Sequence, residues 1–193
     1  MKIDRVLDQD AVYPPLDALI KQANMRDVEA EVQRSLDDPA GFWSDWAQRF
    51  EWTSPWNQVF DAQFPYHRWF VGGKTNITAN ALDRHADGEN ADKTALVAID
   101  EDNSSREVSY AELRDLVSTF AAALQDLGVG VGDTVIIYMP LTLEGIISML
   151  ACARIGAIHS VVYAGMGVGA LAERTEDIDA NVIIAGDVSM RRG

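Results

Sequence analysis

Apolar residues in the second half of the chain recur at two different spacings. The longest run begins after Ser109-Tyr-Ala-Glu112, a sequence of the capping-box form that starts helices, and it ends at Gly128. Its apolar positions recur three and four residues apart: Leu113, Leu116, Val117, Phe120, Ala121, Leu124 and Leu127. This spacing places them on one face of a helix, so it predicts an amphipathic helix between Ser109 and Gly128.

Short runs rich in β-branched residues follow this helix and alternate with longer segments. Residues 134–138, 157–162 and 181–185 are predicted to be buried strands. Residues 143–155 and 168–178 are predicted to be the helices between them. Strands that alternate with helices are typical of a parallel sheet with right-handed crossover connections. The pattern therefore predicts an α/β fold from about residue 94 onward.

The first part of the chain is rich in aromatic residues, and all five tryptophans fall within residues 43–69. Asp38-Pro39 predicts a helix start, because proline at the first helical position loses no needed hydrogen bond. Four aromatic side chains then share the predicted helix face: Phe42, Trp43, Trp46 and Phe50. We interpret them as a packing surface, because the stretch lacks the interleaved basic residues of a base-stacking platform. The domains predicted are a helical, Trp-rich extension at 1–90 and an α/β subdomain at 91–193.

Charge and composition exclude several classes of partner. Thirty acidic and sixteen basic residues give a net charge of −14, which repels polyphosphates except where arginines reverse the local field. Nucleic-acid binding is therefore not expected. No stretch approaches the roughly 20 apolar residues that cross a bilayer, and the first residues lack the apolar core of a signal peptide. The sequence predicts a cytoplasmic protein without a membrane partner.

The residue types that carry catalysis are sparse. Cys152 lies in an apolar run and is predicted to be a small core residue, and His159 lies in an apolar strand and is predicted to be a core histidine. His67 and His85 have no metal-ligand companions at useful spacing. The sequence holds no G-x-x-x-x-G-K-[ST] loop, no Cys/His cluster and no G-x-S-x-G elbow, so an NTPase, a zinc enzyme and a serine hydrolase are unsupported. No catalytic and no metal-binding residue is assigned in this chain.

Two glycine-rich segments invite a phosphate-binding interpretation. Residues 128–133 lie after a helix and before a strand, so a helix C-cap and tight turn are predicted there. Residues 163–170 lie after a strand and open a helix, where free amides and the helix dipole favour an anion. Three positions in this segment and one after the next strand fit a dinucleotide-binding pattern: Gly165, Gly167, Ala170 and Asp187. A nicotinamide or flavin nucleotide, another nucleotide and a plain turn all stay open from the pattern alone.

Arg191 and Arg192 follow the last predicted strand, at the sheet edge where open α/β folds bind ligands. Guanidinium groups suit phosphate oxygens, and a solvated pair of surface charges is the alternative. The sheet's last predicted strand has no closing element after it, which would leave an open edge. We therefore expect the chain to be the first part of a longer protein.

Several blocks in order along the chain resemble AMP-forming acyl-CoA synthetases of the acetyl-CoA synthetase type. The blocks are Trp69-Phe-Val-Gly-Gly-Lys-Thr-Asn-Ile-Thr-Ala-Asn80, Leu82-Asp-Arg-His85, Val108-Ser-Tyr-Ala-Glu-Leu113, Gly132-Asp-Thr-Val-Ile-Ile-Tyr-Met-Pro140, Met149-Leu-Ala-Cys-Ala-Arg-Ile-Gly-Ala-Ile-His-Ser-Val-Val162 and Arg191-Arg-Gly193. They run from about residue 40 to the end, with spacing similar to that of the family. The resemblance implies the first part of the large domain of an adenylate-forming enzyme.

The resemblance also implies a function and a site. Members of this family activate a carboxylic acid with ATP and Mg²⁺ and transfer it to coenzyme A, so the parent enzyme would be an acid-thiol ligase acting on a short-chain, acetate-like acid. Tyr163, Gly165 and Arg191 match the family's coenzyme A contacts, while Ala164 stands where acetyl-specific enzymes usually have glycine. The ATP-binding and catalytic groups of the family lie downstream of this segment. The chain alone is therefore expected to be inactive, with no complete cofactor site.

Two other functions stay open at this point. One is a dinucleotide-binding oxidoreductase domain that uses the glycine pattern described above. The other is a stand-alone interaction module, in which the open sheet edge pairs with a partner or with a second copy of the chain.

Overall fold

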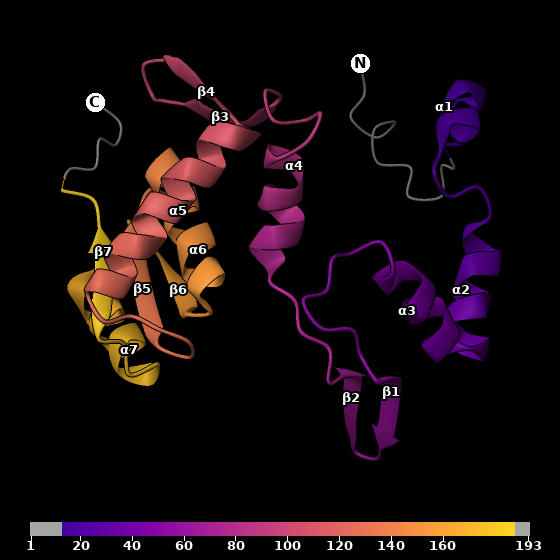
Figure 1. Cartoon of the computed structure of the whole chain (residues 1–193). Coiled ribbons are helices and arrows are strands. Elements are labelled where there is room, and N and C mark those ends of the chain that lie inside the picture. Colours follow the sequence, from indigo (N-terminus) through magenta and orange to yellow (C-terminus); the bar gives the residue numbers. More distant parts are fainter. Residues whose placement is uncertain (1–12, 188–193) are drawn as a thin grey trace, which may run out of the picture. The chain divides into compact units, whose positions relative to one another are not determined.

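The computed structural model describes residues 13–187 and contains two compact units (Figure 1). The first unit comprises the described residues up to 48 together with 59–69. The second comprises 49–58 and the chain from residue 70 onward. The sequence boundary near residue 90 rests on a change of composition and stays a prediction.

The first unit begins with three helices, α1 (Asp17–Gln22), α2 (Val28–Asp37) and α3 (Pro39–Ala47). The Asp38 carboxylate accepts a hydrogen bond from the Gly41 amide at 2.9 Å and caps α3, which confirms the predicted helix start. Phe42 and Trp43 pack edge to face with ring centroids 5.2 Å apart. Phe50 lies beyond the end of α3 and is 54% exposed, so the predicted aromatic face is wrong at that position.

A two-stranded sheet interrupts the part of the chain that was predicted to be helical. Its strands are β1 (Gln58–Gln63) and β2 (Tyr66–Val71). Phe60 and Trp69 face each other across it with ring centroids 4.3 Å apart. Each strand has only six residues, which is too short for its period to stand out in the sequence.

The second unit begins with an aromatic cluster in which the rings of Trp52, Trp56 and Phe70 lie about 5 Å from one another. A short helical stretch follows, comprising a π-helical turn η2 (Ala79–Asp83) and α4 (Arg84–Ala86). The chain then forms an antiparallel hairpin of β3 (Thr94–Ile99) and β4 (Ser105–Ser109). The parallel pattern predicted from about residue 94 therefore does not hold for this pair, because a five-residue connection is too short for a crossover helix.

A three-stranded parallel sheet forms the centre of the second unit. Its strands are β5 (Thr134–Met139), β6 (Ile158–Tyr163) and β7 (Val182–Ala185), in the order β6-β5-β7. The helices are α5 (Tyr110–Asp126), α6 (Leu143–Ile155) and α7 (Val168–Asp177). This arrangement confirms the predicted parallel sheet with crossover helices. The Ser109 hydroxyl accepts from the Glu112 amide at 3.2 Å, as the capping box predicted.

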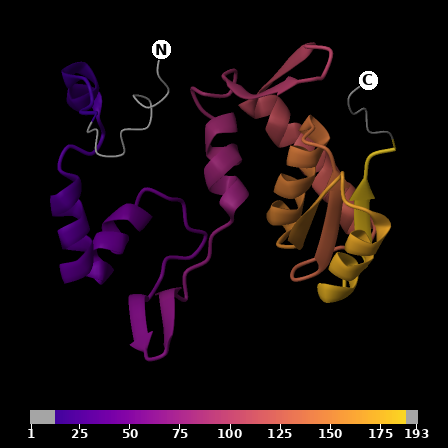
Figure 2. The same cartoon turned by 180° about the vertical axis from the view of Figure 1, so that it is seen from behind.

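The two crossovers run in opposite directions from the central strand. The chain passes from β5 to β6 on one side and then returns past β5 to β7 on the other. Right-handed connections therefore place α6 and α7 on opposite faces of the sheet (Figure 2). Helices α5 and α6 bury the main core, which contains Val135 of β5. Helix α7 lies over the face that carries Thr134, Ile136 and Tyr138.

A polar clasp joins the segment around η2 to the end of α6. The Asn76 amide donates to the carbonyl oxygens of Ala153 and Arg154 at 3.1 and 3.0 Å, which satisfies two carbonyls of the last turn. The Arg154 guanidinium donates to the Asp83 carboxylate at 2.5 Å, with side chains only 23% and 30% exposed. Leu82 beside them is buried. Segments about 70 residues apart in sequence are thus held together by charge-assisted contacts.

We expect Asp83→Asn to lower the free energy of unfolding by about 2 kcal/mol, because Arg154 would keep its charge in a half-buried place without a counterion. Urea unfolding followed by circular dichroism measures the change. The matched control is Asp115→Asn, which removes the exposed carboxylate that pairs with Arg114. It should lower the free energy of unfolding by less than about 0.5 kcal/mol. Equal losses in both variants would contradict the clasp.

Candidate functional site: the turn between β6 and α7

The turn that leaves β6 at Tyr163 lies at the carboxyl edge of the parallel sheet. Tyr163 is the last residue of β6 and pairs with Met139 at the end of β5. The Met166 amide donates to the Tyr163 carbonyl at 2.9 Å, which closes a tight turn. Gly167 is the N-cap residue of α7, so the helix begins directly after this turn. The carboxyl ends of open α/β sheets are where such folds bind ligands.

The central strand anchors this turn through one side chain. The hydroxyl oxygen of Tyr138 in β5 lies 3.2 Å from the Ala164 carbonyl oxygen and 2.9 Å from that of Met166. Both contacts join residues more than 25 positions apart in sequence. The turn is therefore tied to the buried strand as well as to its own ends.

The sequence named three residues for this site, and the structure places two of them. Tyr163 is 62% exposed, and Gly165 is exposed two residues later in the same turn. Arg191 lies outside the described residues, so its place in the site stays a prediction. The last paired residue of β7, Ala185, is opposite Tyr138 in the register. The chain thus leaves β7 at the sheet edge that holds the Tyr163 turn.

The start of α7 favours a negatively charged group. A helix leaves the amides of its first turn without partners inside the helix, and no described side chain caps them here. A Cβ atom built on Gly167 or Gly169 would meet no atom within 4 Å, so the approach to these amides is open. Backbone amides at this position can bind phosphate oxygens.

The dinucleotide pattern fits this geometry poorly. Gly165 and Gly167 do lie between a strand and a helix, and Ala170 lies in the first turn of that helix, as that pattern requires. However, β7, which leads to Asp187, is not the neighbour of β6, because β5 lies between them. Two strand spacings put β7 about 9.5 Å from β6. In a dinucleotide-binding βαβ unit the acidic residue follows the adjacent strand, so the predicted oxidoreductase site is not assembled here.

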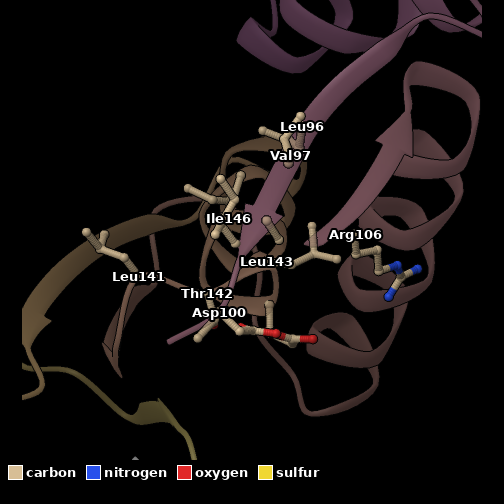
Figure 3. Close-up of a pocket in the computed structure, with 11 residues that line it drawn as sticks. Leu96, Val97, Asp100, Arg106, Leu141, Thr142, Leu143 and Ile146 are labelled. Atoms are coloured by element: carbon tan, nitrogen blue, oxygen red, sulfur yellow. The ribbon is translucent and has the colours of Figure 1, made fainter. Parts of the chain in front are cut away.

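A groove of about 430 Å³ lies between the β3–β4 hairpin and the start of α6 (Figure 3). Its walls are mainly apolar, and its polar side chains include Asp100, Arg106, Thr142 and Glu144. The Arg106 guanidinium donates to Glu112 at 2.6 Å, so its charge is already paired. Two carboxylates in the lining oppose a phosphate ligand. The sequence did not predict this groove, because its walls come from elements that are distant along the chain.

Comparison with known proteins decides the family. The family model described as AMP-binding enzyme matches residues 82–192. The chain belongs to the AMP-binding enzyme family. A second model, described as acetyl-coenzyme A synthetase N-terminus, matches residues 28–81. The recognised resemblance and the predicted fold class are thereby confirmed.

Curated members of this family are similar over nearly the whole chain. An acetyl-coenzyme A synthetase of Thiobacillus denitrificans is 44% identical over 99% of this chain, and a 3-hydroxypropionyl-coenzyme A synthetase of Metallosphaera sedula is 46% identical over 88%. The chain spans 30% and 26% of their lengths. The solved acetoacetyl-CoA synthetase of Streptomyces lividans superposes on 87% of this chain with a TM-score of 0.76 and 26% identity, and 27% of that enzyme is covered.

Residues 13–187 of this AMP-binding family member contain neither a candidate metal-holding cluster nor a candidate membrane-spanning helix. No group of three or more His, Cys, Asp or Glu side chains gathers there to hold a metal ion. Within the same range, no helix is both long and apolar enough to cross a membrane. His159 is half-buried in β6, and burial lowers the pKa of its imidazole. A core histidine was the prediction, and the neutral form is the one that such burial favours.

Cys152 is fully buried in α6, which confirms its predicted role as a small core residue. Burial raises the pKa of its thiol, so the reactive thiolate is disfavoured in the folded chain. We expect iodoacetamide at pH 8 to alkylate the native chain at least about tenfold more slowly than the urea-unfolded chain. Mass spectrometry of timed samples measures both rates. Equal rates in the two states would contradict the buried, protonated thiol.

Proposed function

We propose that this chain supplies part of the coenzyme A site of an AMP-forming acid-thiol ligase. The reaction joins a short-chain, acetate-like carboxylic acid to coenzyme A at the expense of ATP, with Mg²⁺ neutralising phosphate charge. The observation that carries the proposal is the anchored, exposed turn from Tyr163 to Gly167, which opens α7 at the carboxyl edge of the sheet. Two curated relatives with the same matched region are named as coenzyme A synthetases.

The chemistry of the turn supports a nucleotide phosphate as the group that it contacts. The amides at the start of α7 can donate to phosphate oxygens, and the Tyr163 ring offers an exposed aromatic surface beside them. A net charge of −14 opposes polyanions over most of the surface. We therefore infer that Arg191 supplies a local cation for the phosphate. Ala164, where acetyl-specific relatives usually have glycine, turns its carbonyl oxygen toward Tyr138.

The chemical step belongs to groups that this chain does not contain. Adenylation requires groups that stabilise charge on the transferring phosphoryl centre, and the family resemblance implies that these groups lie downstream of this segment. The relatives are named for different acids, acetate and 3-hydroxypropionate among them, so the acid of this enzyme is left open within the short-chain class. A cytoplasmic location and self-association through the exposed sheet edge also stay predictions.

We expect coenzyme A, in excess over its Kd, to raise the thermal midpoint of the purified chain, because it binds the folded state alone. A tenfold excess would raise the midpoint by about 3–6 °C, and NAD should give no shift. Differential scanning fluorimetry across a concentration series up to the millimolar range measures the effect. The shift should disappear in Arg191→Ala.

The control variant for this experiment is Arg174→Ala. It removes the same charge from the other end of α7 and should keep the coenzyme A shift. A shift with NAD and none with coenzyme A would overturn the assignment. A shift that survives Arg191→Ala would remove that residue from the proposed site.

The 193-residue chain should not release AMP when it is given ATP, Mg²⁺ and acetate, because it lacks the groups that would stabilise the transferring phosphoryl centre. A coupled assay for AMP at high chain concentration provides the test. A full-length family member serves as the positive control. AMP release that depends on both acetate and the chain would contradict the proposed division of the enzyme.

A further inference from the structure

Two hydroxyl groups on one face of β5 hold the two ends of the α7 crossover. At one end of the strand, the Thr134 hydroxyl donates to the carbonyl oxygens of Ile178 and Asp179, at 2.8 and 3.0 Å, just after α7. At the other end, the Tyr138 hydroxyl contacts the two carbonyl oxygens of the turn before α7. The two residues are four positions apart in one strand, so their side chains share a face.

The Tyr138 contacts determine how the amides of the turn point. In a trans peptide unit the carbonyl and the N–H of the next residue point in opposite directions. The carbonyls of Ala164 and Met166 point at the Tyr138 hydroxyl, so the N–H groups of Gly165 and Gly167 point away from it. Within the described part of the chain, neither of these two amides donates to another group.

The outward amides have the surroundings of an anion site. Both belong to exposed glycines, so no side chain shields them. Gly167 also caps α7, whose first-turn amides add to the positive potential of the helix start. Unpaired backbone N–H groups in a turn at a helix start can bind phosphate oxygens.

We propose that Tyr138 is the positioning residue of the coenzyme A site: its hydroxyl holds two carbonyls inward and thereby presents the Gly165 and Gly167 amides to a phosphate group of the nucleotide end. This inference rests on the proposed function. It adds to the proposed site a residue of a neighbouring strand, Tyr138, which acts by holding the turn and does not itself contact the ligand.

The test uses Tyr138→Phe, which removes the hydroxyl and keeps the ring. Isothermal titration of the chain with coenzyme A should show a Kd raised by about three- to tenfold. Adenosine 3′,5′-bisphosphate, which mimics the nucleotide end, should lose affinity by the same factor. Hydrogen exchange should quicken at the amides of Met166 and Leu171, which donate to the carbonyls of Tyr163 and Gly167, and this reports the loosened turn directly.

Thr134→Val is the matched control, because it removes a hydroxyl with two carbonyl partners from the same face of the same strand. It should quicken exchange near residues 178–180 and leave the Kd for coenzyme A unchanged. Comparable losses of affinity in Thr134→Val and Tyr138→Phe would mean a general loss of stability and would overturn the positioning role.

A second variant removes a proposed donor itself. Gly167 has φ −72°, within the range of proline, and a Cβ atom there meets nothing within 4 Å, so Gly167→Pro removes the amide N–H at a backbone angle that proline can adopt. It should weaken coenzyme A binding by a similar factor. In the double variant with Tyr138→Phe, the Kd should rise by less than the product of the two single factors.

The outcomes separate this inference from the function on which it rests. Unchanged coenzyme A affinity in Tyr138→Phe overturns the role of Tyr138 and leaves the proposed function in place. Multiplying effects in the double variant also overturn it, because the two groups would then act independently. A wild-type chain that binds neither coenzyme A nor the bisphosphate overturns both proposals.

Discussion

Parallel pairing of β5 with a strand on each side is the interaction on which the α/β unit depends. Val135, Ile136 and Ile137 have almost no accessible surface, because helices cover one face, α7 lies over the other and neighbours pair with both edges. Burying each such side chain favours folding by about 1.5–3 kcal/mol. Both β6 and β7 take their register from this strand, so the loops that follow them leave from the same edge of the sheet.

The same strand carries polar groups at its two ends, where the apolar core gives way to loops. A partly buried hydroxyl needs a hydrogen-bond partner, and both hydroxyls find carbonyls in the segments that flank α7. The strand that organises the core therefore also fixes the turn in which Tyr163 and Gly165 lie. Strand β5 thus contributes both to the stability of the core and to the geometry of the proposed ligand site, and the Tyr138 hydroxyl connects that strand to the turn.

Local signals predicted several elements closely. Helix α6 has the predicted limits, 143–155, because Thr142 caps its start and Gly156 ends it in a left-handed conformation with φ 76°. The hairpin β3–β4 was not predicted, since antiparallel pairing arises from contacts between strands and leaves little trace in five or six residues. Tyr138 lies in an apolar run, and no local pattern predicts its hydrogen-bond partners, which lie 26 and 28 residues away.

The sequence by itself determined the apolar periods of the helices and strands, the helix caps, and the position of a glycine-rich turn between a strand and a helix. These signals act over a few neighbouring residues. The family resemblance assigned two residues of that turn, Tyr163 and Gly165, to the proposed ligand site. Only the tertiary structure decided that β5 separates β6 from β7, which disfavours a dinucleotide unit, and that Tyr138 holds the turn. Strand neighbours and distant hydrogen bonds follow from how the whole core packs, and no short stretch of sequence contains that information.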